Sequence, residues 1–438
     1  MARLAPRFTN WAGNQTCLPM ERRAPMSTDE VADIVATAHS RGGRVKVVGA
    51  GHSFTDAACT NGVLLSLDAI DEVTDHDPET REVTVGAGIR LHDLNERLHD
   101  LGLALPNLGD IDTQSLAGAT ATATHGTGRA LGNLSTNIVG FELVTGTGEV
   151  LWCDASSNAE VWSVGRVGIG ALGVVTKIRL SGVPSFNLHA DERGAGLDKL
   201  LDDWDGFVSS ADHTEFFWLP GSGACLTKRN RRTDEPERPP SRVRHLIEKE
   251  FGENVALDLA MRAVRRFPSQ RERIRSAFAA VGTSSRDVVD RSYRVFASPR
   301  RVRFREMEYS IPVAAVPEAL RRVRSLVDAM AEPPLFPVEV RVSAADDIAL
   351  STAEGRDSGW IAVHQYVGIP YGDYFRGVEA IMDDYDGRPH WGKLHFQTHE
   401  TLRPRYPQWD RFAEARAKVD PSGTFRNDYL DRVLGPID

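Results

Sequence analysis

The sequence predicts an α+β protein of the nucleotide-binding type. Segments typical of short strands and of helices alternate over the first 183 residues. Two of the strand-like segments run directly into glycine-rich turns, at residues 49–51 and 86–88. Hydrophobic residues make up 41% of the chain and charged residues 26%, a composition that supports a packed core.

The first helix is expected at residues 27–41. Ser27 and Glu30 have the spacing of a capping box, and apolar side chains then recur at helical spacing. A second helix is expected after Gly88, where leucines recur every three or four residues. Strands are expected at residues 44–48, 63–67, 83–86 and 172–180, and a hairpin at residues 138–153.

The composition changes after Pro184, which we take as the start of a second domain. Residues 228–244 are polar and contain prolines, which predicts a loop. Strand-like segments return at 335–343 and 360–368, and a turn is expected at residues 420–423. A chain of 438 residues is long enough for two or three domains.

The charge and hydropathy patterns exclude several classes of protein. Lys and Arg number 52 and Asp and Glu 61, so the net charge of −9 argues against nucleic-acid binding. The sequence has no apolar run of transmembrane length and no apolar stretch typical of a secretory signal near its start. We expect a cytoplasmic protein, with association with a membrane surface left open.

The cysteines do not form a recognisable site. Cys17, Cys59, Cys153 and Cys225 lie far apart in the sequence, with neither a CxxC pair nor the spacing of metal ligands. We expect free, buried thiols of a reducing compartment, no disulfide and no bound metal.

A glycine-rich loop at residues 48–54 follows the strand expected at 44–48. Glycine lets backbone N–H groups approach a phosphate closely. A dinucleotide-binding fingerprint would need glycine at position 54 and a helix after it, but the residue is Phe54 and the following sequence is a poor helix former. His52 within this loop either stabilises a turn or contacts a ligand.

Residues 114–128 consist almost entirely of small and hydroxyl-bearing side chains. A core helix would carry larger side chains. Such a segment fits a backbone that lies against a flat cofactor, with hydroxyls and free amides as donors. A close helix-packing seam is the alternative.

Charged residues near the C-terminal end form a third group. Glu339 and Arg341 stand two residues apart on an expected strand, hence on one face. A carboxylate beside a guanidinium is expected to stay ionised, and Arg and Lys stabilise an oxyanion. Lys393 ends the motif Arg388-Pro389-His390-Trp391-Gly392-Lys393. Each pair alone also fits a structural ion pair.

Together these segments resemble the aldonolactone oxidoreductase branch of the vanillyl-alcohol oxidase/p-cresol methylhydroxylase flavoproteins. The glycine–histidine loop, the small-residue segment, the Glu339–Arg341 strand and the His-Trp-Gly-Lys motif occur in the family's order, and the resemblance covers nearly the whole chain. It implies a two-domain FAD-binding fold of this type with a substrate (cap) domain. The implied division is an FAD-binding domain at residues 1–183, a substrate domain at 184–396 and a C-terminal segment at 397–438 that returns to the FAD domain.

The resemblance also implies the cofactor and its ligands. FAD would be covalently linked through His52; relatives with a second link carry a cysteine in the segment that here reads Gly109-Asp110-Ile111-Asp112, so one link is implied. The cofactor-binding residues implied are Val48, Gly49, Ala50, Gly51, His52, Ser53, Phe54, Gly109, Asp110, Ser115, Gly118, Thr122, His125, Gly126 and Val174. The catalytic residues implied are Glu339, Arg341, His364 and Lys393.

The implied reaction is the oxidation of a sugar-derived secondary alcohol by hydride transfer to FAD. The substrate expected is an aldono-1,4-lactone, such as an L-gulono- or D-arabinono-lactone, and the product a 2-keto lactone that enolises to an ascorbate-type compound. Arg341 and Lys393 would stabilise the developing oxyanion. The electron acceptor would be O2 or an acceptor such as cytochrome c.

Two other functions stay open. Alditol oxidases share the fold and oxidise open-chain polyols with O2, but they have Ala-Ser in place of Gly109-Asp110 and Thr in place of Tyr366. These differences favour a lactone. A non-catalytic flavin- or sugar-binding module is the second alternative, and the presence of Glu339, Arg341 and Lys393 argues against it.

Overall fold

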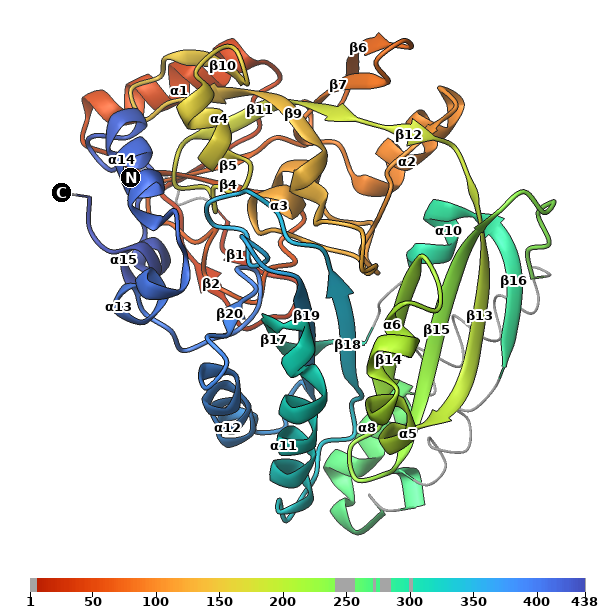
Figure 1. The fold of residues 1–438 in the computed structure, drawn as a ribbon. Helices are drawn as coiled ribbons and strands as arrows, with labels where there is room; N and C mark the ends of the chain where they lie inside the picture. The colour runs from red at the N-terminus through yellow and green to blue at the C-terminus, as the bar shows by residue number, and fades with distance from the viewer. Residues whose placement is uncertain (1–5, 241–256, 271–272, 276–284, 299–301, 438) are drawn as a thin grey trace.

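The computed structural model describes residues 6–240, 257–270, 273–275, 285–298 and 302–437. Figure 1 shows two sheet-containing parts, one built mainly from the N-terminal half and one dominated by a broad sheet of later strands, with the C-terminal helices beside the first part. In the described ranges, no helix combines the length and the apolar character that crossing a membrane requires.

A small parallel sheet carries the glycine-rich loop. Its strand order is β3-β5-β4, with β3 at Glu21–Arg23, β5 at Val63–Ser66 and β4 at Val45–Val48. Helix α1 (Thr28–Ser40) begins where expected, since the Ser27 hydroxyl accepts from the Glu30 amide at 3.2 Å. The buried side chains of α1 pack on this sheet. The C-terminal end of β4 therefore leads into the loop from a fixed position.

A five-stranded antiparallel sheet lies beside it, in the order β10-β9-β11-β7-β6. The expected hairpin is confirmed, because β9 and β10 pair and the Thr145 amide donates to Glu149 O at 2.9 Å. The elements of this part are β6 (Val73–Asp77), β7 (Glu82–Gly86), α2 (Leu91–Asp100), β8 (Leu103–Ala104), α3 (Leu116–Ala121), η1 (Leu134–Asn137), β9 (Ile138–Val144), β10 (Val150–Asp154), α4 (Ala159–Gly165), β11 (Val174–Ser181) and β12 (Val183–Pro184).

An eight-stranded antiparallel sheet forms the second part, in the order β16-β13-β15-β14-β18-β19-β17-β20. Helices α11 and α12 pack against its apolar side chains. The elements are β13 (Asn187–Gly196), α5 (Leu197–Asp202), α6 (Trp204–Val208), β14 (His213–Trp218), β15 (Ala224–Thr233), α8 (Leu257–Arg266), η3 (Pro268–Gln270), β16 (Arg286–Arg291), α10 (Ser292–Phe296), β17 (Phe304–Pro312), η4 (Val313–Ala315), α11 (Val316–Asp328), β18 (Val338–Ser343), β19 (Ser358–Tyr366), α12 (Gly372–Asp383) and β20 (Arg388–Pro389).

The prediction of a loop at residues 228–244 is wrong for residues 228–233. Residues 228–233 belong to β15, which pairs with β13 on one side and β14 on the other. Its basic side chains have partners on neighbouring segments, such as Glu215 for Lys228 and Ser210 for Arg229, so polar composition did not exclude a strand. Residues 241–244 lie outside the described part of the chain.

The C-terminal helices pack on the N-terminal part. Tyr429, Leu430, Trp409 and Phe412 share one core with side chains of β7, β9 and α2. Figure 1 shows α14 next to α1 and α4, with α15 and α13 below it. The elements of this segment are α13 (His399–Leu402), η5 (Arg403–Arg405), α14 (Trp409–Val419) and α15 (Asp428–Leu434), while the N-terminal strands β1 (Phe8–Thr9) and β2 (Thr16–Cys17) form a hairpin of their own.

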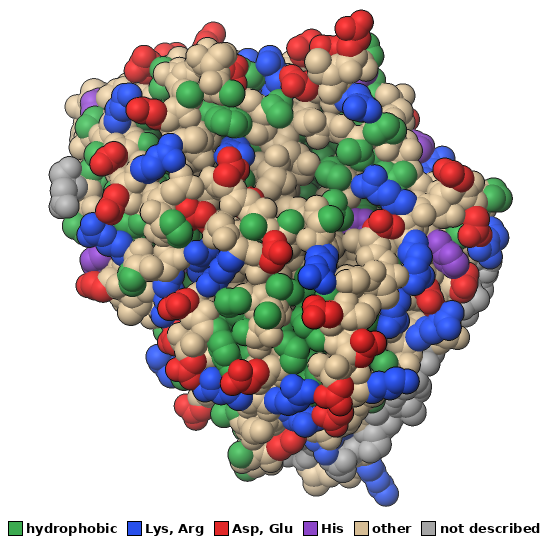
Figure 2. Space-filling model, viewed as in Figure 1, with side chains coloured by type: hydrophobic (Ala, Val, Ile, Leu, Met, Phe, Trp, Pro, Cys, Tyr) green, Lys and Arg blue, Asp and Glu red, His purple; other side chains and the backbone are tan. Residues whose placement is uncertain are grey.

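The cysteines are free, but they are not all buried or separate. Cys153 and Cys225 are buried, whereas Cys17 and Cys59 are half-buried. Burial and the neighbouring Cys17 raise the pKa of Cys59 to about 12. Figure 2 shows basic and acidic side chains interspersed over one face of the molecule, in keeping with its modest net charge.

Candidate active site

An elongated cavity starts at the loop that follows β4. Residues 46–55 line it, together with α3 and the turn at residues 165–173. Small residues are required here: a Cβ on Gly49 would lie 2.1 Å from Ser115 Oγ, and Gly51 has a φ of +69°. The Ser115 hydroxyl caps α3 by accepting from the Gly118 amide at 3.3 Å. Close to the loop, the cavity wall therefore consists of backbone and small side chains.

This lining fits FAD. A largely apolar cavity beside a glycine loop and a helix N-terminus suits a dinucleotide, whose phosphates backbone amides can bind. A Cβ on Gly118 would come within 2.9 Å of Ser115 Oγ, so side chains larger than hydrogen would intrude between loop and helix. The residues predicted to bind FAD that line this cavity are Val48, Gly49, Ala50, Gly51, His52, Ser53, Phe54, Ser115, Gly118 and Thr122.

His52 lies at one end of this cavity. Its Nε2 is 3.0 Å from Thr113 Oγ1, and its ring stacks on Trp11 with ring centroids 5.2 Å apart. Burial, followed by the positive charges of Lys393 and Arg90, lowers the pKa of His52 to about 4. The imidazole is therefore neutral at physiological pH, with a free electron pair on one nitrogen.

A second cavity joins the first at this end. Phe304, His390 and Lys393 line both, so the two cavities are continuous past His52. The lining of the second cavity is otherwise charged and aromatic. It comprises Gly109, Asp110, Ile111, Gln114, Thr124, His125, Phe217, Glu306, Glu308, Phe336, Pro337, Glu339, Arg341 and His364.

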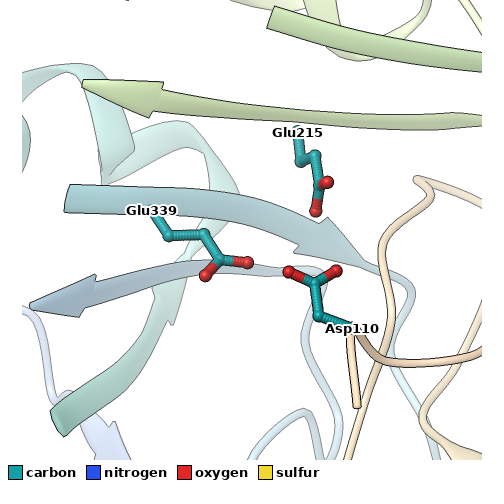
Figure 3. A group of neighbouring side chains, drawn as sticks. All are labelled: Asp110, Glu215 and Glu339. Carbon is teal, nitrogen blue, oxygen red and sulfur yellow. The ribbon is translucent and has the colours of Figure 1, made fainter. Parts of the chain in front are cut away.

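The Arg341 guanidinium lies among three carboxylates. It is 2.6 Å from Asp110 and 2.9 Å from Glu215, and it also contacts Glu339. Figure 3 shows that the three carboxylates come from a loop, β14 and β18 and point toward one another. All four side chains are almost fully buried. Arg341 supplies the positive charge that this arrangement requires.

The carboxylate of Glu339 behaves differently from our expectation. We expected the neighbouring guanidinium to keep it ionised. Burial, together with the negative charges of Asp110 and Glu215, outweighs Arg341 and raises the pKa of Glu339 to about 7. Glu339 is therefore close to half-protonated at neutral pH, because burial and two neighbouring carboxylates oppose its ionisation more than Arg341 favours it.

Lys393 and His364 meet at a carboxylate that the sequence did not single out. Lys393 Nζ contacts Glu306, and the other oxygen of Glu306 lies 3.4 Å from His364 Nε2. His364 Nδ1 is 2.9 Å from Pro337 O, so Nδ1 donates its proton there. Burial opposes ionisation of Glu306, but Lys393 and His364 lower its pKa to about 2.

Glu308 lies two residues further along β17 and faces the same cavity. Its carboxylate is 3.2 Å from His125 Nε2, and the His125 ring stacks on Trp360 with centroids 3.6 Å apart. His125 Nδ1 lies 2.8 Å from Gly126 O. His125 therefore belongs to the wall of the second cavity.

Sequence reasoning missed Glu306, Glu308, Glu215 and His390. One signal was available for the first two, because acidic residues two apart in an otherwise apolar strand have the spacing that identified Glu339 and Arg341. Glu215 shares this position only through the pairing of β14 with β18. No local pattern marks it.

The other predicted residues are distributed as follows. Glu339, Arg341, His364 and Lys393 all line the second cavity, as do Gly109, Asp110 and His125. Two of the residues predicted to bind FAD, Val174 and Gly126, are not among those that line the two cavities. Val174 packs in the core under α1, while its neighbours Gly173 and Val175 line the elongated cavity; Gly126 lines neither cavity, because Asn107 and Leu108 lie against it.

Comparison with known proteins assigns the chain. Residues 178–433 match the family described as D-arabinono-1,4-lactone oxidase, and residues 22–154 match the FAD binding domain. The chain is 48% identical to the L-gulono-1,4-lactone dehydrogenase of Mycobacterium tuberculosis, over 99% of this chain and 100% of the relative. The chain belongs to the aldonolactone oxidoreductases. This oxidoreductase is also 34% identical to the L-gulonolactone oxidase of Bos taurus, over 98% of each chain.

A solved structure supports the fold of this aldonolactone oxidoreductase. A solvent-stable cholesterol oxidase superposes with a TM-score of 0.83 at 20% identity, over 98% of this chain and 97% of the other. Together with the FAD binding domain match, this confirms the predicted fold of the vanillyl-alcohol oxidase/p-cresol methylhydroxylase type and the FAD-dependent enzyme class.

Proposed function

We propose that this enzyme oxidises the C2 hydroxyl of an aldono-1,4-lactone, such as L-gulono-1,4-lactone, to a 2-keto lactone that enolises to an ascorbate-type product. The observation that carries the proposal is the convergence of two cations, Arg341 and Lys393, in the cavity that adjoins His52. The lactone dehydrogenase and lactone oxidase among its relatives support this substrate class.

The reaction removes a proton from the hydroxyl and a hydride from the carbon that bears it. Negative charge therefore develops on the substrate oxygen, and the buried cations of Arg341 and Lys393 stabilise it. Glu339 orients Arg341 and accepts a hydrogen bond from a substrate hydroxyl when it is ionised. FAD, when bound, supplies the hydride acceptor.

We infer that residues 1–183 and 397–438 hold FAD, and that residues 184–396 provide the substrate cavity. The glycine loop would bind the phosphates, and His52 would link the flavin covalently. A neutral imidazole at the end of the cavity supports the link, because only an unprotonated ring nitrogen can form the bond. The free cysteines support a cytoplasmic location, which cell fractionation tests.

Anaerobic reduction of the bound flavin tests the substrate class. The enzyme is mixed without O2 with a panel of aldonolactones and of open-chain alditols, and flavin absorbance is followed. Bleaching by lactones and not by alditols supports the proposal, whereas faster bleaching by xylitol or sorbitol identifies an alditol oxidase. Bleaching by neither group would leave the non-catalytic alternative.

The electron acceptor is proposed as O2 or a carrier such as cytochrome c.

Asp110 favours a lactone over an alditol as substrate, whichever acceptor is used. Its carboxylate forms an ion pair with Arg341 at 2.6 Å and takes up space in the cavity that a flexible polyol would need. Asp110→Ser is expected to raise the activity with alditols relative to the activity with lactones.

A further inference from the structure

We propose that Glu306 is a positioning residue of the reaction: it holds the Lys393 ammonium and the His364 imidazole toward the substrate cavity and keeps Lys393 protonated. The inference rests on the proposed function only for the role of Lys393 toward the lactone. The ionisation of Lys393 is measurable without a substrate.

The geometry around Glu306 supports this role. One carboxylate oxygen contacts Lys393 Nζ and the other lies 3.4 Å from His364 Nε2, so the two oxygens engage two different partners. Glu306 is 5% exposed, and a buried carboxylate needs such partners to stay charged. The carboxylate therefore fixes the separation of the two groups that face the substrate.

The tautomer of His364 follows from the same contacts. Pro337 O can only accept a hydrogen bond, so His364 Nδ1 carries a proton. Nε2 then lies 3.4 Å from the Glu306 carboxylate, so the two contacts together fix the orientation of the ring at the cavity.

Lys393 is surrounded by charged and titratable groups from several elements. Glu306 and Glu308 face it from β17, Glu339 from β18, and His52 and His390 lie on the glycine loop and on its own segment. Burial lowers the pKa of Lys393, but the three carboxylates outweigh burial and raise the pKa above its usual value. Glu306 is the carboxylate in direct contact, so its charge is expected to dominate.

The test is chemical labelling of Lys393 in the FAD-loaded enzyme without substrate. Acetic anhydride acylates only the neutral amine, and peptide mass spectrometry gives the labelling rate as a function of pH. The exposed Lys418 serves as an internal reference. In Glu306→Gln the rate for Lys393 at a fixed alkaline pH is expected to rise at least about tenfold, the change for one pKa unit.

Two further variants keep the test decisive. Glu306→Asp, which retains the charge on a shorter side chain, is expected to label at a rate between wild type and Glu306→Gln. Glu379→Gln is the matched control, since this buried carboxylate bonds Tyr309 and the Phe396 amide instead. It is expected to label like wild type.

Activity provides a second readout. In Glu306→Gln the alkaline limb of the kcat profile is expected to move to lower pH, with KM changed less than kcat; a purely structural role would lower kcat at all pH values alike. The proposal is overturned if Lys393 in a folded Glu306 variant is labelled with the same pH dependence as in the wild-type enzyme. Altered labelling in an enzyme that oxidises no lactone would instead refute the proposed function and leave the role of Glu306 intact.

Discussion

The Oγ1 atom of Thr113 lies 3.0 Å from Nε2 of His52. This contact engages one ring nitrogen and leaves Nδ1 for the flavin. We therefore expect FAD to stay on the protein after acid denaturation, visible as fluorescence on a gel under ultraviolet light, and to be attached through Nδ1 in NMR spectra of the flavin peptide.

His52→Ala is expected to fold and to bind FAD without the bond, because the loop amides remain. Thr113→Val, which keeps the shape and loses the hydroxyl, should attach flavin more slowly. Release of all flavin from the wild-type enzyme in acid would refute the covalent link.

Lys393 is expected to act on the reaction and not on FAD binding. Lys393→Met should lower kcat by roughly 10²–10³, the usual cost of losing one oxyanion donor, with an unchanged flavin spectrum. Arg341→Lys is the better probe at the neighbouring position, since removing the guanidinium charge would take its cation away from three buried carboxylates. Loss of flavin together with activity would mean that these residues are structural.

Glu339 is expected to give kcat/KM an ionisation near pH 7, since burial and the neighbouring carboxylates raise its pKa to about 7. The ionised form orients Arg341, so kcat/KM should increase as pH rises through this value. Glu339→Gln should remove the step. Asp110→Asn removes a negative neighbour, lowers the pKa of Glu339 and should move the step to lower pH; a step that moves upward would contradict this assignment.

Glu306 is also expected to make stability depend on acid. Its pKa is about 2 in the folded protein and near 4.3 when unfolded, so its ionised form stabilises the fold above about pH 4.3 and this contribution is lost as pH falls toward 2. The gap in Tm between wild type and Glu306→Gln should narrow over that range.

Glu354 provides the opposite case. Burial raises its pKa to about 7, so the unfolded state loses its proton first as pH rises. The cost of the native Glu354 to stability therefore grows between about pH 4.3 and 7 and persists above pH 7. Glu354→Gln should therefore gain in Tm relative to wild type over this range. If the Tm difference from wild type depended on pH in the same way in Glu306→Gln and in Glu354→Gln, both pKa assignments would be refuted.

Local patterns predicted much of the fold and part of the site. The Ser27 cap of α1, the β9–β10 hairpin and the glycine loop depend on neighbours in sequence, and each was found. Only the Ser27 half of the predicted capping box formed, because the Glu30 carboxylate accepts from the Met26 amide. The position of Glu215 beside Arg341 depends on a strand order in which β14 meets β18. The charged strand β15 was mistaken for a loop because its basic side chains find partners in other segments: Lys228 pairs with Glu215 of β14, and Arg229 bonds Ser210. Such pairings have no trace in the local sequence.

We predict that Gly109 helps to determine which electron acceptor reoxidises the reduced enzyme. Gly109 lies beside Asp110 in the second cavity, where the hydrogen in place of a side chain leaves space for a small molecule such as O2. A Cβ at this position would be 3.2 Å from His125 O and 3.5 Å from Thr124 Cγ2, so an alanine fits after a shift of the neighbours by a few tenths of an ångström. We expect O2 to reoxidise the reduced enzyme measurably but slowly, and a dye or cytochrome c to support faster turnover. The reason is that the carboxylates of Asp110, Glu306 and Glu308 disfavour the negative charge that O2 gains when it is reduced in this cavity. Stopped-flow reoxidation of the reduced enzyme in air-saturated buffer, compared with turnover on the dye, measures the difference. Gly109→Ala should slow the O2 step and leave lactone oxidation by the dye unchanged, and reoxidation by O2 that keeps pace with the dye would identify an oxidase.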